Sequence, residues 1–84
     1  MPIVSMYSTL MCPYCVKAER LLNKKGVQIK KILVDQNREE MIKMIEITKR
    51  RTVPQIFIGE RHVGGYDDLV ELDMAGELDP LLAQ

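Results

Sequence analysis

Two cysteines separated by a proline and a tyrosine, Cys12-Pro13-Tyr14-Cys15, are the only cysteines in this chain of 84 residues. They follow a strand-like run, Ile3-Val4-Ser5-Met6-Tyr7, and precede a helical pattern that includes Ala18, Leu21 and Leu22. Residues three positions apart in a helix return to the same face. The two cysteine α-carbons should then lie about 5–6 Å apart, which a disulfide can bridge. The sequence therefore predicts a reversible disulfide at the start of a helix.

Cys12 is expected to be the N-cap of this helix, with Pro13 at the first helical position, which tolerates a missing N–H. The free amides of the first helical turn carry partial positive charge. A thiolate at Cys12 is stabilised by them. We therefore expect the pKa of this thiol to lie below the free value of about 8.5.

The cysteine pair has few other uses in a chain of this composition. Zinc needs four ligands, and beyond the two cysteines only His62 and carboxylates remain, which disfavours a structural zinc site. A structural disulfide here would close a very small loop and constrain the unfolded chain little. A C-x-x-C pair after the first strand of a βαβ unit is instead typical of thioredoxin-like redox proteins.

Length and composition indicate one globular domain, residues 1–84, with an apolar share of 46%. Twelve basic residues balance twelve acidic ones, so no overall charge favours nucleic acid or an anionic membrane. The start, Met1-Pro2-Ile3-Val4, lacks the basic residues and long apolar core of a signal peptide, and no apolar run approaches the roughly 18 residues that span a bilayer. We therefore expect a cytoplasmic monomer with no membrane or nucleic-acid partner.

The apolar pattern predicts the element order β-α-β-α-β-β-α. Strands are expected over residues 3–7, 27–34, 55–58 and 61–63, and helices over residues 13–25, about 38–50 and about 66–74. A short capped helical turn, Asp79-Pro80-Leu81-Leu82, is expected to lay its two leucines on the core. Two parallel strands joined through a helix and an antiparallel hairpin make an α/β fold, a four-stranded mixed sheet with helices on both faces.

Capping and turn residues predict where these elements end. Gly26 ends the first helix, and Asn37 with Glu40 resembles a capping box at the start of the second. Gly59-Glu60 suits a type II′ turn in the hairpin, and Gly76 ends the third helix. Four residues of the second helix share one face and are expected to fill the core: Met41, Met44, Ile45 and Thr48.

Three segments resemble the signature segments of dithiol glutaredoxins: Cys12-Pro13-Tyr14-Cys15, Thr52-Val53-Pro54 and Gly64-Gly65-Tyr66-Asp67-Asp68. They occur in that family's order and spacing, and the resemblance covers essentially the whole chain, most of all to the short bacterial members. It implies a thioredoxin-like fold with a cis peptide bond before Pro54. It also implies a thiol–disulfide oxidoreductase of cell redox homeostasis and electron transport, with Cys12 as nucleophile and Cys15 as resolving thiol.

The same resemblance implies glutathione as co-substrate, no permanently bound cofactor, and disulfide-bonded or glutathionylated proteins as partners. Val53 would offer its backbone N–H and C=O to the cysteinyl unit of glutathione, as an added strand does. The amides of Asp67 and Asp68, at a helix start, would bind the γ-glutamyl carboxylate, and their side chains its ammonium group. The other residues expected to contact glutathione are Tyr14, Thr52, Pro54, Gly65 and Tyr66.

Several residues near this site have more than one interpretation. Arg50 and Arg51 either reach the glycyl carboxylate of glutathione or are solvated charges at a helix end. Asp67 either binds glutathione or is only an N-cap. His62, on the hairpin, is expected to be an ordinary surface residue.

Thr9 departs from the family pattern, because members often carry a lysine three residues before the first cysteine. There the lysine supports the thiolate and the glycyl end of glutathione. Here Thr9 takes its place, and Leu10-Met11 makes the approach to Cys12 apolar. We therefore expect Cys12 to depend on helix amides, with Arg50 or Arg51 as possible help. The pKa of Cys12 should be less depressed than in lysine-bearing relatives.

Two other functions stay open at this point. Two chains bridging an iron–sulfur cluster through Cys12 and glutathione would make a dimeric cluster carrier. The resemblance weighs against this function on two grounds. A proline next to the first cysteine, here Pro13, disfavours cluster assembly in the family, and monothiol relatives with a C-G-F-S motif are the usual carriers. A thioredoxin-type enzyme reduced by a flavoprotein typically has C-G-P-C after a tryptophan, whereas Met11 precedes Cys12 here and the chain has no tryptophan.

Overall fold

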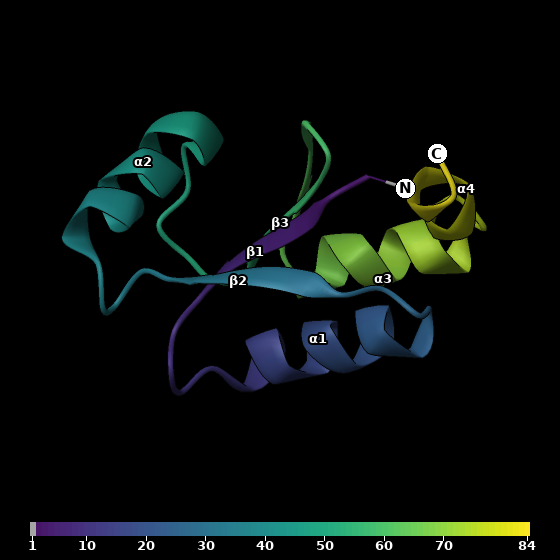
Figure 1. The fold of residues 1–84 in the computed structure, drawn as a ribbon, viewed down its shortest axis with the longest axis horizontal. Helices are drawn as coiled ribbons and strands as arrows, with labels where there is room; N and C mark the ends of the chain where they lie inside the picture. Colours follow the sequence, from purple (N-terminus) through teal and green to yellow (C-terminus); the bar gives the residue numbers. More distant parts are fainter. Residues whose placement is uncertain (1) are drawn as a thin grey trace.

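The computed structural model describes residues 2–84. Met1, which belongs to the N-terminal segment discussed for signal-peptide features, lies outside the described residues. The order is β1 (Val4–Ser8), α1 (Pro13–Lys24), β2 (Ile29–Leu33), α2 (Arg38–Thr48), β3 (Gln55–Ile58), β4 (Arg61–Gly64), α3 (Tyr66–Met74) and α4 (Leu78–Leu82) (Figure 1). The predicted order of the first seven elements is confirmed, and the short helical turn adds an eighth. Among the residues described, no helix is long and apolar enough to span a membrane.

The four strands form one sheet in the order β2-β1-β3-β4. Val4 of β1 pairs with Ile29 of β2 in parallel and with Ile58 of β3 antiparallel, and β3 and β4 are antiparallel. This is the predicted mixed sheet. Strand β2 is an edge strand, which explains why Lys30 and Lys31 are exposed within it.

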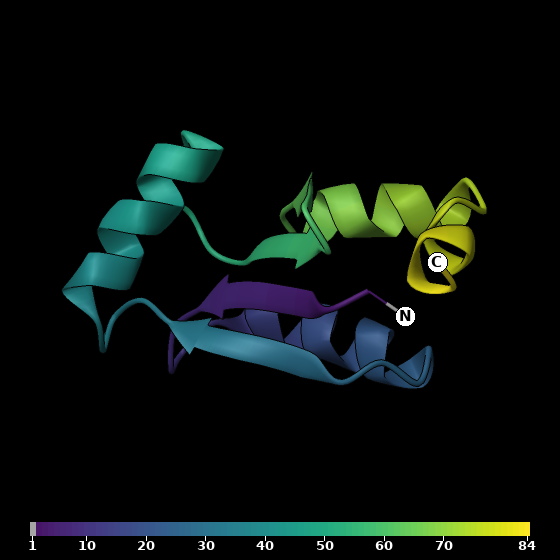
Figure 2. The same cartoon turned by 45° about the horizontal axis from the view of Figure 1, so that its top comes forward.

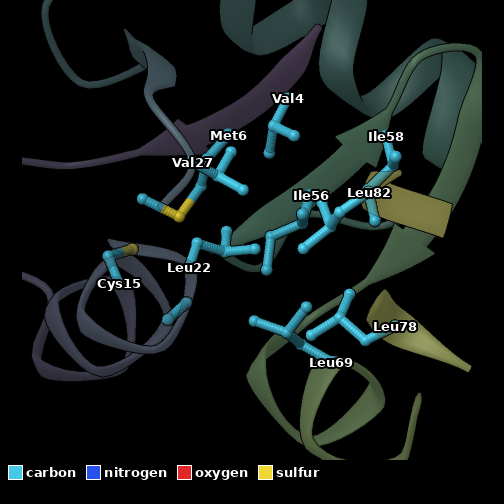
Figure 3. Packing of buried hydrophobic residues seen from close by; sticks show 11 residues of the cluster. Val4, Met6, Cys15, Leu22, Val27, Ile56, Ile58, Leu69, Leu78 and Leu82 are labelled. Atoms are coloured by element: carbon cyan, nitrogen blue, oxygen red, sulfur yellow. The ribbon is translucent and has the colours of Figure 1, made fainter. Parts of the chain in front are cut away.

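Alternation along β1 and β3 sends side chains to both faces of the sheet. Val4 and Met6 of β1 join Ile56 and Ile58 of β3 on the face that packs against α1, α3 and α4 (Figure 3). The helices supply the remaining fully buried side chains of this face: Ala18, Leu22, Leu69 and Leu78. In Figures 1 and 2, α2 lies well apart from α1 and α3.

The other face carries a smaller core built from Tyr7, Val34 and Met44. The rings of Tyr7 and Phe57 meet edge to face with centroids 6.1 Å apart. Met44 and Thr48 of α2 are buried as predicted, whereas Met41 and Ile45 are partly buried. Helices therefore cover both faces, as the sequence predicts.

Local residues explain where the elements begin and end. Asn37 caps α2 by accepting a hydrogen bond from the Glu40 amide at 3.3 Å. The predicted end of α2 near Arg50 was two residues too late, because the Thr48 hydroxyl donates to the Met44 carbonyl at 2.7 Å and accepts from the Arg50 amide at 3.0 Å. Lys49 then adopts a left-handed conformation, φ 61°, and the helix stops.

Two of the predicted turn residues behave as expected. Gly59 has φ 61° and no positive φ occurs at Glu60, which fits the type II′ turn.

Strand β2 begins at Ile29, two residues later than predicted.

The C-terminal helix differs in detail from the prediction. Leu78 and Leu82 are buried, while Leu81 only packs against the core from outside. Glu77, the N-cap, makes no side-chain capping bond, so the turn is not capped as expected. Lys25 ties the end of α1 to this region through Asp73 at 2.8 Å and Asp79 at 2.9 Å, and these bonds raise the pKa of Lys25.

Candidate active site

Cys12 and Cys15 stand at the start of α1, as predicted. Cys12 is the N-cap in an extended conformation, φ −138°, and Pro13 is the first helical residue. The sulfurs of the two cysteines are joined as a disulfide, and their α-carbons lie 5.1 Å apart. The backbone N–H of Cys15 donates a hydrogen bond to Cys12 Sγ at 3.2 Å. The helix start thus presents a backbone donor to this sulfur.

The two sulfurs differ in access to solvent. Cys15 is 4% exposed and belongs to the core between the sheet and α1 (Figure 3). Cys12 is only partly buried and packs at the margin of that core. An incoming sulfur can therefore reach Cys12 more easily than Cys15. This asymmetry matches a nucleophile and a resolving thiol.

A cleft of about 260 Å³ lies beside the cysteines. Arg50 and Gln55 line this cleft. The other lining residues are the eight that the resemblance assigns to glutathione binding: Tyr14, Thr52, Val53, Pro54, Gly65, Tyr66, Asp67 and Asp68. Cys12 and Cys15 do not line it, but the Val53 carbonyl oxygen lies 3.9 Å from Cys12 Sγ. The Val53–Pro54 bond is cis, as the resemblance implies.

The start of α3 forms the far wall of the cleft. Gly65 is the N-cap and donates its amide to Asp68 Oδ2 at 2.8 Å, so the interpretation of Asp67 as the N-cap was wrong. Asp68 Oδ2 also accepts from Arg50 Nη1 at 3.1 Å. The Gly65 amide and the Arg50 guanidinium both lower the pKa of the Asp68 carboxyl, although its partial burial opposes them. Asp67 lies in the first helical turn with an exposed side chain.

The arginines before Thr52 differ from each other. Arg50 lines the cleft and forms an ion pair with Asp68, so it is not simply a solvated charge at a helix end. Arg51 is exposed and does not line the cleft.

The two tyrosines stand at the side of the cleft nearest α1. The Tyr14 and Tyr66 rings have centroids 6.1 Å apart, and Lys17 Nζ lies 5.3 Å from the centre of the Tyr14 ring. Tyr14 is 56% exposed, so much of its ring is available to a bound molecule.

The surface leading to Cys12 from the β1 side is apolar, as predicted. Leu10 is 64% exposed and Met11 91% exposed. On that side a shallow depression near Thr9 also contains Lys31 and Glu19, which pair with each other at 3.0 Å. Within residues 2–84 no group of three or more His, Cys, Asp or Glu side chains is placed to hold a metal ion.

Sequence reasoning missed Gln55 and misjudged His62. Gln55 is fully buried, and its Nε2 donates to the Thr52 carbonyl at 3.0 Å and lies 3.3 Å from the Thr52 hydroxyl. Its Oε1 lies 2.7 Å from Nε2 of His62. His62 is half-buried, and its ring stacks on that of Phe57 with the two ring centroids 4.9 Å apart, so it is not an ordinary surface residue. The one available signal was an amide in the apolar run Gln55-Ile56-Phe57-Ile58.

The chain is similar in sequence and in overall fold to known proteins of one family. The glutaredoxin family model matches residues 4–63. A glutaredoxin of Pseudomonas aeruginosa is 48% identical over 83 residues, covering 99% of each chain, and glutaredoxin 3 of Escherichia coli K12 is 48% identical over 79 residues, covering 94% of this chain and 95% of the relative. The crystal structure of a buckwheat glutaredoxin–glutathione complex has a TM-score of 0.90 at 30% identity, over 98% of this chain and 77% of that one.

Proposed function

Because the chain belongs to the glutaredoxin family, and is therefore a thiol–disulfide oxidoreductase, we propose that glutathione is its reductant. The substrates are protein disulfides and mixed disulfides between proteins and glutathione. Cys12 is the nucleophile and Cys15 the resolving thiol. The protein substrate itself is set by surfaces outside the cysteine pair.

The observation that supports this proposal most is the cleft that begins beside Cys12. The Val53 carbonyl borders it and lies 3.9 Å from Cys12 Sγ, so a peptide-like ligand hydrogen-bonded to the Val53 backbone would lie next to that sulfur. At the other end, the amides that open α3 favour a carboxylate. A tripeptide with a central cysteine and carboxylates at its ends fits both features. The buckwheat relative, whose structure is a complex with glutathione, adds to the argument.

With a glutathionylated protein, one cysteine is enough. The Cys12 thiolate attacks the glutathione sulfur, the protein–glutathione S–S bond breaks, and the protein leaves as a thiolate that takes up a proton. Cys12 now carries glutathione. The thiolate of a second glutathione attacks the bound glutathione sulfur, oxidised glutathione leaves, and the Cys12 thiolate is regenerated.

With a protein disulfide, both cysteines are needed. Cys12 attacks one protein sulfur and forms a mixed disulfide with the protein. Cys15, one helical turn away, then attacks the Cys12 sulfur, so the protein leaves fully reduced and the Cys12–Cys15 disulfide remains. Two glutathione molecules reduce that disulfide and leave as oxidised glutathione.

A lowered pKa of Cys12 assists the second half of each cycle more than the first. It raises the thiolate fraction, but it lowers the intrinsic nucleophilicity of the sulfur with a Brønsted slope of about 0.4–0.5, and the two effects nearly cancel in attack. A less basic thiolate is, however, a better leaving group. A lower pKa therefore accelerates mainly the step in which glutathione displaces Cys12. Selectivity for glutathione has to come from binding.

A coupled assay tests the proposal. The protein is mixed with a glutathionylated peptide and NADPH, and is supplied either with glutathione and glutathione reductase or with thioredoxin reductase alone. We expect NADPH oxidation only in the first mixture, and a Cys12→Ser variant should abolish it. Turnover with thioredoxin reductase alone would show that glutathione is not the reductant.

A further inference from the structure

A short chain of hydrogen bonds leads from the hairpin to the edge of the cleft. His62 Nε2 contacts Gln55 Oε1 at 2.7 Å, and Gln55 Nε2 donates to the Thr52 carbonyl at 3.0 Å. Val53 follows Thr52 directly and presents its carbonyl to Cys12 Sγ at 3.9 Å. The chain thus connects a half-buried histidine to the backbone beside the reactive sulfur.

The orientation of each group in this chain is determined by its partner. The Thr52 carbonyl can only accept, so the atom of Gln55 that faces it must be the amide nitrogen. Gln55 Oε1 then faces His62 and needs a donor, so His62 Nε2 carries a proton. This donor is present in the neutral Nε2–H tautomer and in the charged imidazolium. The hydrogen bonds from His62 through Gln55 to Thr52 therefore persist in either protonation state of His62.

Burial makes these bonds important to the loop. Gln55 is fully buried, and a buried amide that lacks hydrogen-bond partners is costly, so its bonds are maintained in the folded state. The segment of Thr52 and Val53 belongs to no helix or strand, and within residues 2–84 no backbone–backbone bond outside the regular elements involves either residue. Among the described residues, the Gln55 side chain thus makes the hydrogen bonds that hold this segment, apart from the longer contact of the Val53 carbonyl with Cys12 Sγ.

We propose that Gln55 and His62 are positioning residues, which hold the Thr52–Val53 backbone at the edge of the cleft and so set the selectivity of Cys12 for glutathionyl disulfides. This inference rests on the proposed function and deepens it. Neither residue touches the reacting sulfurs. They act by keeping the Val53 N–H and C=O aimed at the cysteinyl unit of glutathione before it arrives, which lowers the ordering cost of binding.

Two substitutions separate the hydrogen bond from the packing of the ring. His62→Phe keeps an aromatic ring that can stack on Phe57 but removes the donor to Gln55. His62→Gln keeps an N–H at similar reach and removes the ring. A third variant, Gln55→Met, removes the bonds to Thr52 with little change in volume.

The substrates are two forms of one peptide, whose cysteine carries either glutathione or cysteamine in a disulfide. Cysteamine lacks the peptide groups that Val53 would bind. Reduced enzyme is mixed with each form in a single turnover, and the second-order rate constant for release of the peptide thiol is measured. The selectivity is the ratio of the rate constant for the glutathionylated form to that for the cysteaminylated form.

We expect His62→Phe to lower this selectivity about fivefold, the effect of one neutral hydrogen bond, by slowing only the glutathionylated form. His62→Gln should stay within about twofold of the wild type, and Gln55→Met should lose at least as much as His62→Phe.

Two results would overturn the inference: unchanged selectivity in His62→Phe, or an equal loss in His62→Gln, which would assign the effect to ring packing. If Gln55→Met does not fold, the two His62 variants still decide the question. A wild-type protein that shows no preference for the glutathionylated peptide would instead refute the proposed use of glutathione, so the two failures are distinguishable.

Discussion

The backbone N–H of Cys15 donates a hydrogen bond to the sulfur of Cys12 across 3.2 Å. The donor belongs to the first turn of α1, where free amides form the positive end of the helix. Arg50, one of two cations considered as help for Cys12, is paired with Asp68 instead. The Cys15 amide therefore stabilises a thiolate at Cys12, and Lys31, which lines the same small pocket as Cys12, is paired with Glu19.

Introducing the lysine that the family often carries should strengthen this stabilisation. Thr9→Lys is expected to lower the pKa of Cys12, because Thr9 and Cys12 line the same small pocket and a cation near a thiolate favours the charged form. Absorbance at 240 nm, followed through a pH titration of the reduced protein, reports the thiolate. Thr9→Met serves as the uncharged control. An unchanged midpoint in Thr9→Lys would sink the idea.

The different roles proposed for Cys12 and Cys15 predict that the loss of Cys15 affects only one of the two reactions. Cys15→Ser should keep most of the activity on a glutathionylated peptide, because that route uses Cys12 alone, and should lose reduction of a protein disulfide. Both activities are measured with glutathione and glutathione reductase, and Cys12→Ser is the inactive control. Loss of both activities in Cys15→Ser would refute the role given to Cys15.

The carboxylate of Asp68 should make stability depend on pH in the acid range. Its pKa is lowered in the folded protein by the Gly65 amide and by Arg50, so the folded state binds the proton less tightly than the unfolded chain. This contribution is fully present above the unfolded pKa, near 3.8, and is lost as pH falls through the folded value.

Asp68→Asn should therefore cost about 1 kcal/mol of unfolding free energy at pH 7, because the amide oxygen still accepts the two bonds but no longer carries the charge that strengthens them. Urea unfolding at pH 7 and at the acid end of the stable range measures the cost, which should shrink in acid. Asp67→Asn, one residue earlier in the same turn, is the matched control and should change little. A cost for Asp68→Asn that is equal at both pH values would contradict the assignment.

Two glycines with positive φ should respond differently to substitution. At Gly64, φ 116°, an added Cβ would meet the Asp68 carboxyl carbon at 2.8 Å and Arg50 Nη1 at 3.1 Å. At Gly76, φ 74°, it would meet nothing within 4 Å. We expect Gly76→Ala to cost about 1 kcal/mol, from backbone conformation alone. Gly64→Ala should cost about 3 kcal/mol, because it also displaces the cap of α3.

Urea unfolding of both glycine variants measures this difference. Removing the side chain that obstructs the Cβ gives a further check: in an Asp68→Ala background the extra cost of Gly64→Ala should shrink toward that of Gly76→Ala. Equal costs at the two glycines in the wild-type background would show that the crowding at Gly64 has no energetic consequence.

Features decided by neighbouring residues could be predicted from the sequence. Cys12 caps α1 and Pro13 follows it because both depend on one helical turn, and Asn37 caps α2 for the same reason. The apolar run of residues 3–7 was identified as a strand, and in the structure Val4 and Met6 join one core while Tyr7 joins the other. The parallel pairing of β1 with β2 and the β3–β4 hairpin followed from such local elements and the rules for connecting them, whereas the pairing of β1 with β3 was not predicted.

Errors arose both from local side-chain bonds and from contacts between elements. The Thr48 hydroxyl turned the chain before Arg50, and Leu78 took the core position expected of Leu81. His62 was taken for a surface residue because its partner, Gln55, lies on the neighbouring strand.

The sequence by itself determined the chemistry of this protein: a dithiol at a helix start, in a chain of the glutaredoxin pattern, because sulfur, helix amides and turn residues act over a few positions. Only the tertiary structure decided how the cleft is built. Arg50 and Asp68 are 18 residues apart and Cys12 and Val53 are 41 apart, yet each pair meets in the folded molecule. Such contacts depend on how whole elements pack, and packing is a property of the complete chain.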